Sequence, residues 1–270
     1  MTKRDFQQGK AFPRSLLAAA LVFSALSAFG QATARMPQPT AAGSFTYEAV
    51  TIKPDNSGNG SWRYRLDGFS TSGMPATNLI RNAFGLLTDD QIVGLPAWAK
   101  TEPLAVQAKM DADTAAALAK LPPEEFLKQR QLMMQLLLAQ RFALKVHHAQ
   151  KDLPTYELVV AKTGSMLKSS ASDTGGNMMN GSARIDARAV SMRTLAANLS
   201  LTVGRIVVDK TGLEGSYDFT VDFAPEGADP SDPRPSIFTA LEEQLGLKLV
   251  PSKGPVDVIV VDHVERPSEN

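Results

Sequence analysis

The order of the predicted secondary-structure elements repeats on either side of one segment that is rich in Gly, Ser and Asn. Hydrophobic periodicity predicts the order β-α-β-β-α-β-β over residues 62–162 and the same order over residues 183–264. Eleven of the 19 residues in the intervening segment, 164–182, are Gly, Ser or Asn, which is typical of a linker. The repeat predicts an α+β fold of two duplicated halves, with mainly antiparallel sheets and helices packed on one face. The predicted division is a first half at 45–162, a flexible linker at 163–182 and a second half at 183–270.

A second interpretation of the repeat stays open, because unrelated α+β segments also alternate helices and strands. The clearest helix covers 124–142, after Pro122-Pro123, and the clearest half-buried strand is 216–223, where apolar and polar residues alternate. Further helices are predicted at 77–87 and after the N-cap residues Ser191 and Ser236, and further strands at 45–53, 62–69, 91–95, 104–110, 143–148, 155–161, 183–187, 207–208, 247–250 and 256–264.

The N-terminus has the three-part layout of a secretory signal peptide. Four basic residues precede an apolar stretch at 15–29, and Ala32-Thr33-Ala34 supplies the small residues of a cleavage site. We therefore predict a signal peptide at 1–34, cleavage after Ala34, and a periplasmic or secreted protein. An uncleaved N-terminal anchor is the alternative. No later stretch is long and apolar enough to predict a transmembrane helix after the signal is removed.

Composition excludes several classes of site. The chain has no cysteine, which excludes disulfides, thiolate metal ligands and thiol nucleophiles. Its formal net charge is zero, which argues against a nucleic-acid partner. The signal peptide holds four of the 28 basic and one of the 28 acidic residues, so the mature chain has a net charge of −3. We predict no cofactor.

Catalytic and metal motifs are incomplete. Lysine-threonine-glycine triads and a Ser-x-x-Lys at 165–168 match fragments of the penicillin-recognising enzymes, but the serine lies in the predicted linker rather than at the start of a core helix. His147 and His148 are neighbours on a predicted strand, so they face opposite sides, and we expect both to lack partners. His263 follows Asp262 without a carboxylate cluster around it. We therefore predict no catalytic residue and no metal ligand.

Two segments are candidates for ligand binding. Trp62-Arg63-Tyr64-Arg65 alternates aromatic and basic residues on a predicted strand, a pattern suited to a polyanion or a sugar chain, or to a solvated sheet face. Asp209 and Lys210 stand in a turn before the strand 216–223, where the alternatives are a ligand site and a structural turn. The candidates are Asp209, Lys210, Trp62 and Arg63.

Five segments of the chain carry a family resemblance. They are 47–54 (YEAVTIKP), 94–98 (GLPAW), 136–148 (LLLAQRFALKVHH), 207–219 (VVDKTGLEGSYDF) and the tail at 253–270. Together they resemble a large family of uncharacterised secreted proteins from soil bacteria, whose shared region is a domain of unknown function, and the resemblance covers nearly all of residues 45–270. The resemblance implies an exported protein. Because the domain also occurs fused to membrane metallopeptidases of the β-lactam-sensor antirepressor type, the resemblance also implies a binding or sensing role in the envelope, but no catalytic residue.

These observations predict an exported envelope protein that acts as a non-enzymatic binding or sensory module. Its partner is an unidentified ligand or envelope protein. Two alternatives remain. A hydrolase acting on an envelope or extracellular substrate predicts convergent polar residues with perturbed pKa values in a cleft. A structural or adhesive surface protein is the other.

Overall fold

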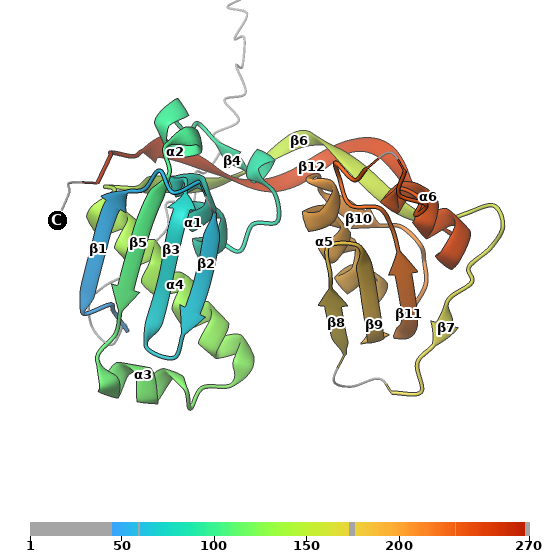
Figure 1. The fold of residues 1–270 in the computed structure, drawn as a ribbon, viewed down its shortest axis with the longest axis horizontal. Helices are drawn as coiled ribbons and strands as arrows, with labels where there is room; N and C mark the ends of the chain where they lie inside the picture. Colours follow the sequence, from blue (N-terminus) through green and yellow to red (C-terminus); the bar gives the residue numbers. More distant parts are fainter. Residues whose placement is uncertain (1–44, 59, 173–175, 230, 268–270) are drawn as a thin grey trace, which may run out of the picture. The chain divides into compact units, whose positions relative to one another are not determined.

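The computed structural model describes residues 45–58, 60–172, 176–229 and 231–267 (Figure 1). The predicted signal peptide at 1–34 and its cleavage site lie outside these residues. Within the described part, the chain forms six α-helices and three four-stranded sheets whose strands pair mostly antiparallel. The predicted α+β class is thereby confirmed, and the duplication of two halves stays a prediction.

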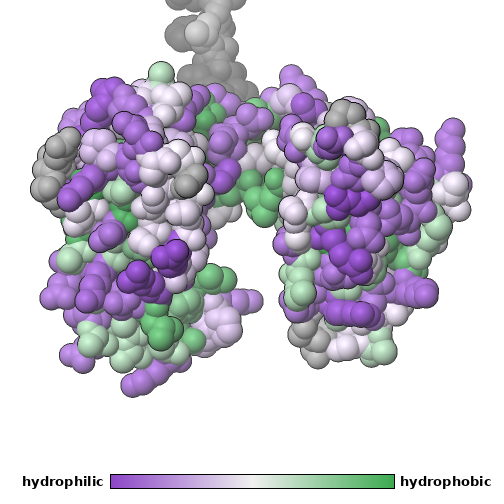
Figure 2. Space-filling view, viewed as in Figure 1, coloured by the Kyte–Doolittle hydropathy of each residue, from purple (hydrophilic) through white to green (hydrophobic). Residues whose placement is uncertain are grey.

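The first sheet has the strand order β1-β5-β3-β2, and all its pairs are antiparallel. One face carries buried apolar residues such as Ile52, Phe69 and Val106, and the opposite face carries Thr51 and Gln107. In Figure 2 the outer face of this sheet is coloured mainly white to purple, as expected for small and polar side chains. The strands are Ala49–Pro54 (β1), Ser61–Arg65 (β2), Gly68–Met74 (β3) and Leu104–Lys109 (β5).

The single strand predicted at 62–69 is wrong, because the chain turns back at Leu66-Asp67 and forms the β2–β3 hairpin. Gly68 begins β3 at a φ of 153°. A Cβ at this position would collide with the carbonyl oxygen of Ala108 on β5, so only glycine fits there without a shift of the backbone. Apolar and aromatic residues occur on both sides of this turn, so hydrophobic periodicity predicts one strand where the structure has two.

Two helices cover the inner face of this sheet, as Figure 1 shows. They are α1, Ala76–Ala83, and α4, Pro123–Arg141, which starts with a proline at its first position as predicted. Gln135 Nε2 on α4 donates to the carbonyl oxygen of Ala83 at 2.9 Å, which joins the two helices. Three short helices that periodicity does not predict complete this part: Asp89–Gln91 (η1), Ala97–Thr101 (α2) and Ala112–Leu118 (α3).

The second sheet is built on a pair of very long strands, β6 and β12, in the order β10-β6-β12-β4. Each was predicted as two strands, and that prediction is wrong, because β6 runs unbroken past Pro154 and β12 past Pro251 and Pro255. At each of these prolines the strand that carries it has a single neighbouring strand, so the ring, which lacks an N–H, can lie on the unpaired side. The strands are Lys145–Val160 (β6), Leu247–His263 (β12), Ile92–Val93 (β4) and Val207–Asp209 (β10).

The third sheet has the order β7-β11-β9-β8 and is antiparallel. Two of its strands, β7 and β8, lie inside the segment 163–182 that was predicted as a linker. Ser191 and Ser236 cap the next two helices by accepting from the backbone N–H of Thr194 and Thr239, as predicted. The elements are Lys168–Ser169 (β7), Asn177–Asn180 (β8), Arg184–Val190 (β9), Tyr217–Asp222 (β11), Met192–Val203 (α5), Ile237–Ala240 (α6) and the π-helical turn Leu241–Leu245 (η2).

Two large hydrophobic cores result, and we call them the first core and the second core. The first core holds the buried residues of β1, β3, β5, α1 and α4, together with Ile259 and Val261 of β12. The second core holds those of β9, β11, α5 and α6, together with Leu158 of β6 and Leu249 of β12. The last strand of the chain therefore contributes to both cores.

Candidate functional site

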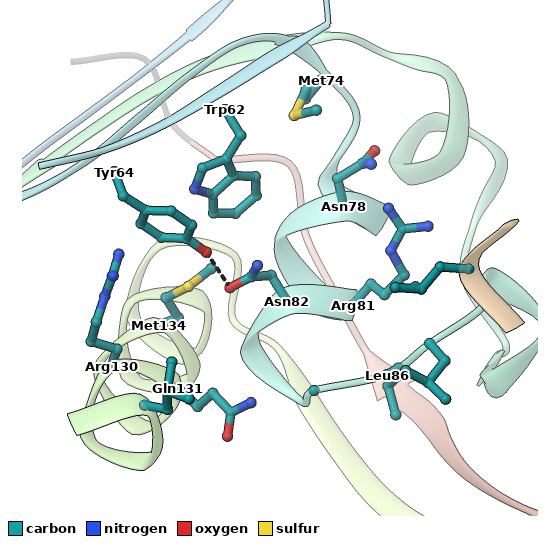
Figure 3. A pocket seen from close by; sticks show the side chains of 14 residues that line it. Trp62, Tyr64, Met74, Asn78, Arg81, Asn82, Leu86, Arg130, Gln131 and Met134 are labelled. Atoms are coloured by element: carbon teal, nitrogen blue, oxygen red, sulfur yellow. Dashed lines mark hydrogen bonds between the residues drawn. The ribbon is translucent and has the colours of Figure 1, made fainter. Parts of the chain in front are cut away.

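A cavity of about 720 Å³ opens beside the first core, between β2, one side of α1 and the middle of α4 (Figure 3). Its size is in the range of pockets that hold small ligands. The polar part of its lining consists of the amides of Asn78, Asn82 and Gln131 and the guanidinium groups of Arg81 and Arg130. The remaining lining includes two rings, Trp62 and Tyr64, and the apolar side chains of Met74, Leu86, Leu87, Leu127 and Met134.

The two rings come from one face of β2, because residues two apart on a strand point the same way. Trp62 stacks on Phe69 of the sheet with ring centroids 5.3 Å apart and planes 17° apart. Tyr64 lies beside Trp62 at 5.6 Å, and its hydroxyl donates to Asn82 Oδ1 at 2.9 Å. Burial raises the pKa of Tyr64, so its phenol is protonated at neutral pH. This side of the cavity is therefore a fixed aromatic wall.

Arg130 lies against the aromatic wall on the side away from Trp62 (Figure 3). The carbon of its guanidinium is 3.8 Å from the centroid of the Tyr64 ring and 5.5 Å from that of Phe126. Among the described residues no carboxylate forms an ion pair with Arg130, and its Nη2 is buried without a hydrogen-bond partner. The nearby Arg81 differs, because its Nη1 is 3.1 Å from Asp89 Oδ1. Arg130 is thus a cation held by rings and not neutralised by an acid.

The chemistry available in the cavity is limited to binding groups. The lining residues that the structure describes include no Asp, Glu, His, Lys, Ser or Thr. Such a set offers hydrogen-bond donors, amide acceptors and aromatic faces, but no ready nucleophile or general base. The arrangement therefore supplies groups that can hold a ligand.

The aromatic and basic segment predicted from the sequence is divided between two faces of the sheet. Trp62 and Tyr64 line the cavity, whereas Arg63 and Arg65 point to the outer face and are exposed. Arg65 borders a shallow depression there. Trp62 and Arg63, two of the predicted candidates, therefore do not belong to one site.

Sequence reasoning missed the α4 side of the cavity. A signal was present, because the positions 127, 130, 131 and 134 share one helix face and two of them are polar in an otherwise apolar stripe. Asn82 could not be found in this way, since its partner Tyr64 lies 18 residues earlier on another element.

The other predicted ligand residues lie in the turn that follows β10 and do not line this cavity. Asp209 Oδ1 accepts from the backbone N–H of Thr211 at 3.0 Å and from its hydroxyl at 2.8 Å, which closes a tight turn. The backbone N–H of Lys210 donates to the carbonyl oxygen of Leu158 at 2.9 Å, and the residue is exposed. A ligand role for Asp209 and Lys210 stays a prediction.

The histidines are placed by the long β6–β12 pair. The expectation that His147 lacks a partner is wrong, because its Nδ1 lies 2.9 Å from Asp262 Oδ1 across the pair. His148 meets the ring of Phe84 edge-on at 6.4 Å, and His263 Nε2 lies 2.8 Å from Glu265 Oε1. Over the described ranges, no three His, Asp or Glu side chains gather in a way that could hold a metal ion.

Comparison with protein families matches residues 77–264 to the model described as "Protein of unknown function (DUF3738)". The chain belongs to the DUF3738 family. Searches of curated proteins and of solved structures found no match. The DUF3738 match includes Asn82 and Arg130, while Trp62 and Tyr64 precede it. Within the residues that the structure describes, no helix of this DUF3738 protein has the length and apolar character needed to cross a membrane.

Proposed function

We propose that this DUF3738 protein is an exported, non-enzymatic binding module of the cell envelope that holds a sugar chain in the cavity beside the first core. The predicted signal peptide supports the location. The observation that carries the binding role is the make-up of the cavity: two rings, three amides and two guanidinium groups around an apolar floor. Amides pair with hydroxyl groups as donors and acceptors, and apolar side chains suit the C–H faces of a sugar ring.

The hydrolase alternative receives no support from the cavity. A hydrolase needs a positioned nucleophile or an acid–base pair, commonly with a raised carboxyl pKa. The carboxyl groups with shifted pKa values lie outside the cavity, and hydrogen bonds lower each of these pKa values. The hydroxyl of Ser72, for example, lowers the pKa of Asp55 to about 2. Such shifts favour the ionised carboxylate, which is the opposite of the raised pKa that a catalytic acid needs.

Isothermal titration calorimetry against a panel of neutral and acidic oligosaccharides, peptidoglycan fragments included, tests the proposal. We expect at least one oligosaccharide to bind, and Tyr64→Leu to weaken it at least about tenfold, because loss of an aromatic anchor commonly costs 2 kcal/mol or more. Tyr156→Leu is the matched control, since Tyr156 also has an arginine over its ring, Arg205 at 4.8 Å, but does not line the cavity. Absence of binding across the whole panel, or equal weakening by both variants, would reject the proposal.

A further inference from the structure

We infer that the sugar held in this cavity carries a carboxylate, and that Arg130 is the residue that selects it. The inference rests on the proposed function and adds the charge class of the ligand. It starts from the balance of charge around the cavity. The lining contains two arginines and, among its described residues, no acidic side chain. Arg81 is neutralised by Asp89, so the positive charge that remains for a ligand is that of Arg130.

The way Arg130 is held leaves its charge available. Stacking on Tyr64 and proximity to Phe126 fix the plane of the guanidinium without placing a negative charge beside it. A planar guanidinium in a fixed orientation binds a carboxylate through two parallel hydrogen bonds, which a flexible ammonium group does less well. A protein that only needed Arg130 for packing would gain from an acidic neighbour, and the described residues provide none.

A second donor without a partner adjoins the same tyrosine ring. Trp62 Nε1 can only donate, is buried, and has no acceptor among the described residues. In Figure 3 the nitrogen edge of the indole is turned toward Tyr64, whose other side carries Arg130. The two unmatched donors therefore lie on either side of the Tyr64 ring, and both favour a ligand that supplies acceptor oxygens.

The amides on the other side of the cavity decide between kinds of acid. A fatty acid or another acid with an apolar body would leave Asn78 and Gln131 without partners when it excluded water from them, and unpaired amides are costly. A sugar acid presents hydroxyl groups to those amides and its carboxylate to Arg130. The shared chemistry is that of a sugar unit bearing a free carboxylate, whether a uronic acid of a polysaccharide or the muramic acid of a peptidoglycan strand from which the stem peptide has been removed.

Two matched pairs of probes test the inference by calorimetry. In the first pair, trigalacturonate is compared with its methyl ester, in which the charge is removed from the same sugar chain. In the second pair, N-acetylmuramic acid is compared with its own methyl ester. We expect the acid of at least one pair to bind about tenfold more tightly than its neutral partner, with a preference that shrinks as salt is added. The pair that shows the preference identifies the source of the sugar.

Variants then assign the preference to Arg130. We expect Arg130→Gln to bind acid and neutral probe alike and Arg130→Lys to keep part of the preference. Arg193→Gln, which removes an exposed arginine of α5 outside the cavity, should behave as the unaltered protein. Melting temperatures of all variants confirm folding. A preference that survives Arg130→Gln, or equal binding of acid and neutral probe, overturns the inference and leaves the proposed function standing. Failure of all four probes overturns the inference, and the oligosaccharide panel then decides the proposed function separately.

Discussion

Replacing Phe142 by alanine probes how tightly the first core is packed. Phe142 follows α4 directly and is 0 % exposed, which makes it one of the largest fully buried side chains. Loss of a fully buried phenylalanine ring removes its transfer free energy and leaves a cavity, so we expect the free energy of unfolding to fall by about 3–5 kcal/mol. With a urea dependence of about 2 kcal/mol per M, the unfolding midpoint falls by about 2 M. A loss below about 1 kcal/mol would refute the packing argument.

Urea unfolding of a second variant, Phe219→Ala, measures whether the two cores unfold together. The chain has two tryptophans, Trp62 and Trp98, and both pack against the first core, so tryptophan fluorescence reports on that core alone. Phe219 belongs to the second core and is 9 % exposed. Because β6 and β12 pair along their length and contribute to both cores, Phe219→Ala should lower the urea midpoint seen by fluorescence as well as by circular dichroism. A fluorescence midpoint that does not move, beside a shifted dichroism signal, would show that the strand pair does not couple the cores.

Three further predictions concern single positions. Gly68→Ala should cost more than about 1 kcal/mol of stability in urea unfolding, because the new Cβ meets a carbonyl oxygen of β5, whereas Gly60→Ala, with its nearest neighbour at 3.8 Å, should cost less. The pKa of Asp55, about 2, should rise in Ser72→Ala when followed by NMR titration of the carboxyl carbon. Because folding lowers this pKa, the stability that the ionised carboxylate contributes is present above pH 4, its ordinary pKa being near 4, and is lost as the pH falls toward 2. A pKa of Asp55 that does not change in Ser72→Ala would show that the Ser72 hydroxyl is not the main cause of the lowered pKa. Intact mass of the exported protein should show cleavage after Ala34, and a species that retains residues 1–34 would indicate an anchor.

Local signals in the sequence predicted the elements whose stability is local. The alternation at 216–223 places Tyr217, Phe219 and Val221 on one face of β11, and these three are buried. Ser191 and Ser236 cap the helices that follow them. In each case the deciding interaction lies within a few residues, so the pattern carries the information needed.

Interactions between distant residues explain what the sequence could not predict. Pro154 looks like the end of a strand unless one knows that β6 has a single neighbour at that point. His147 and Asp262 are 115 residues apart, and neither has a local motif that points to the other. The cavity is similar, because Trp62 was found from its strand, while Arg130 and Asn82 come from two helices that only the packing of the first core brings beside it. Topology, rather than propensity, defines these contacts.

The return of β12 to the first core has a consequence for the order of folding. Ile259 and Val261 complete a core whose other buried members lie before residue 145, so the first core cannot be finished until nearly the whole chain is available to fold. Pairing of Lys145 with His263 closes a loop that contains the entire second core, and contacts between such distant residues form slowly. The second core, whose residues all lie between 158 and 249, has no such requirement and can form first. A chain that is truncated before residue 259 should therefore still form the second core but fail to complete the first core.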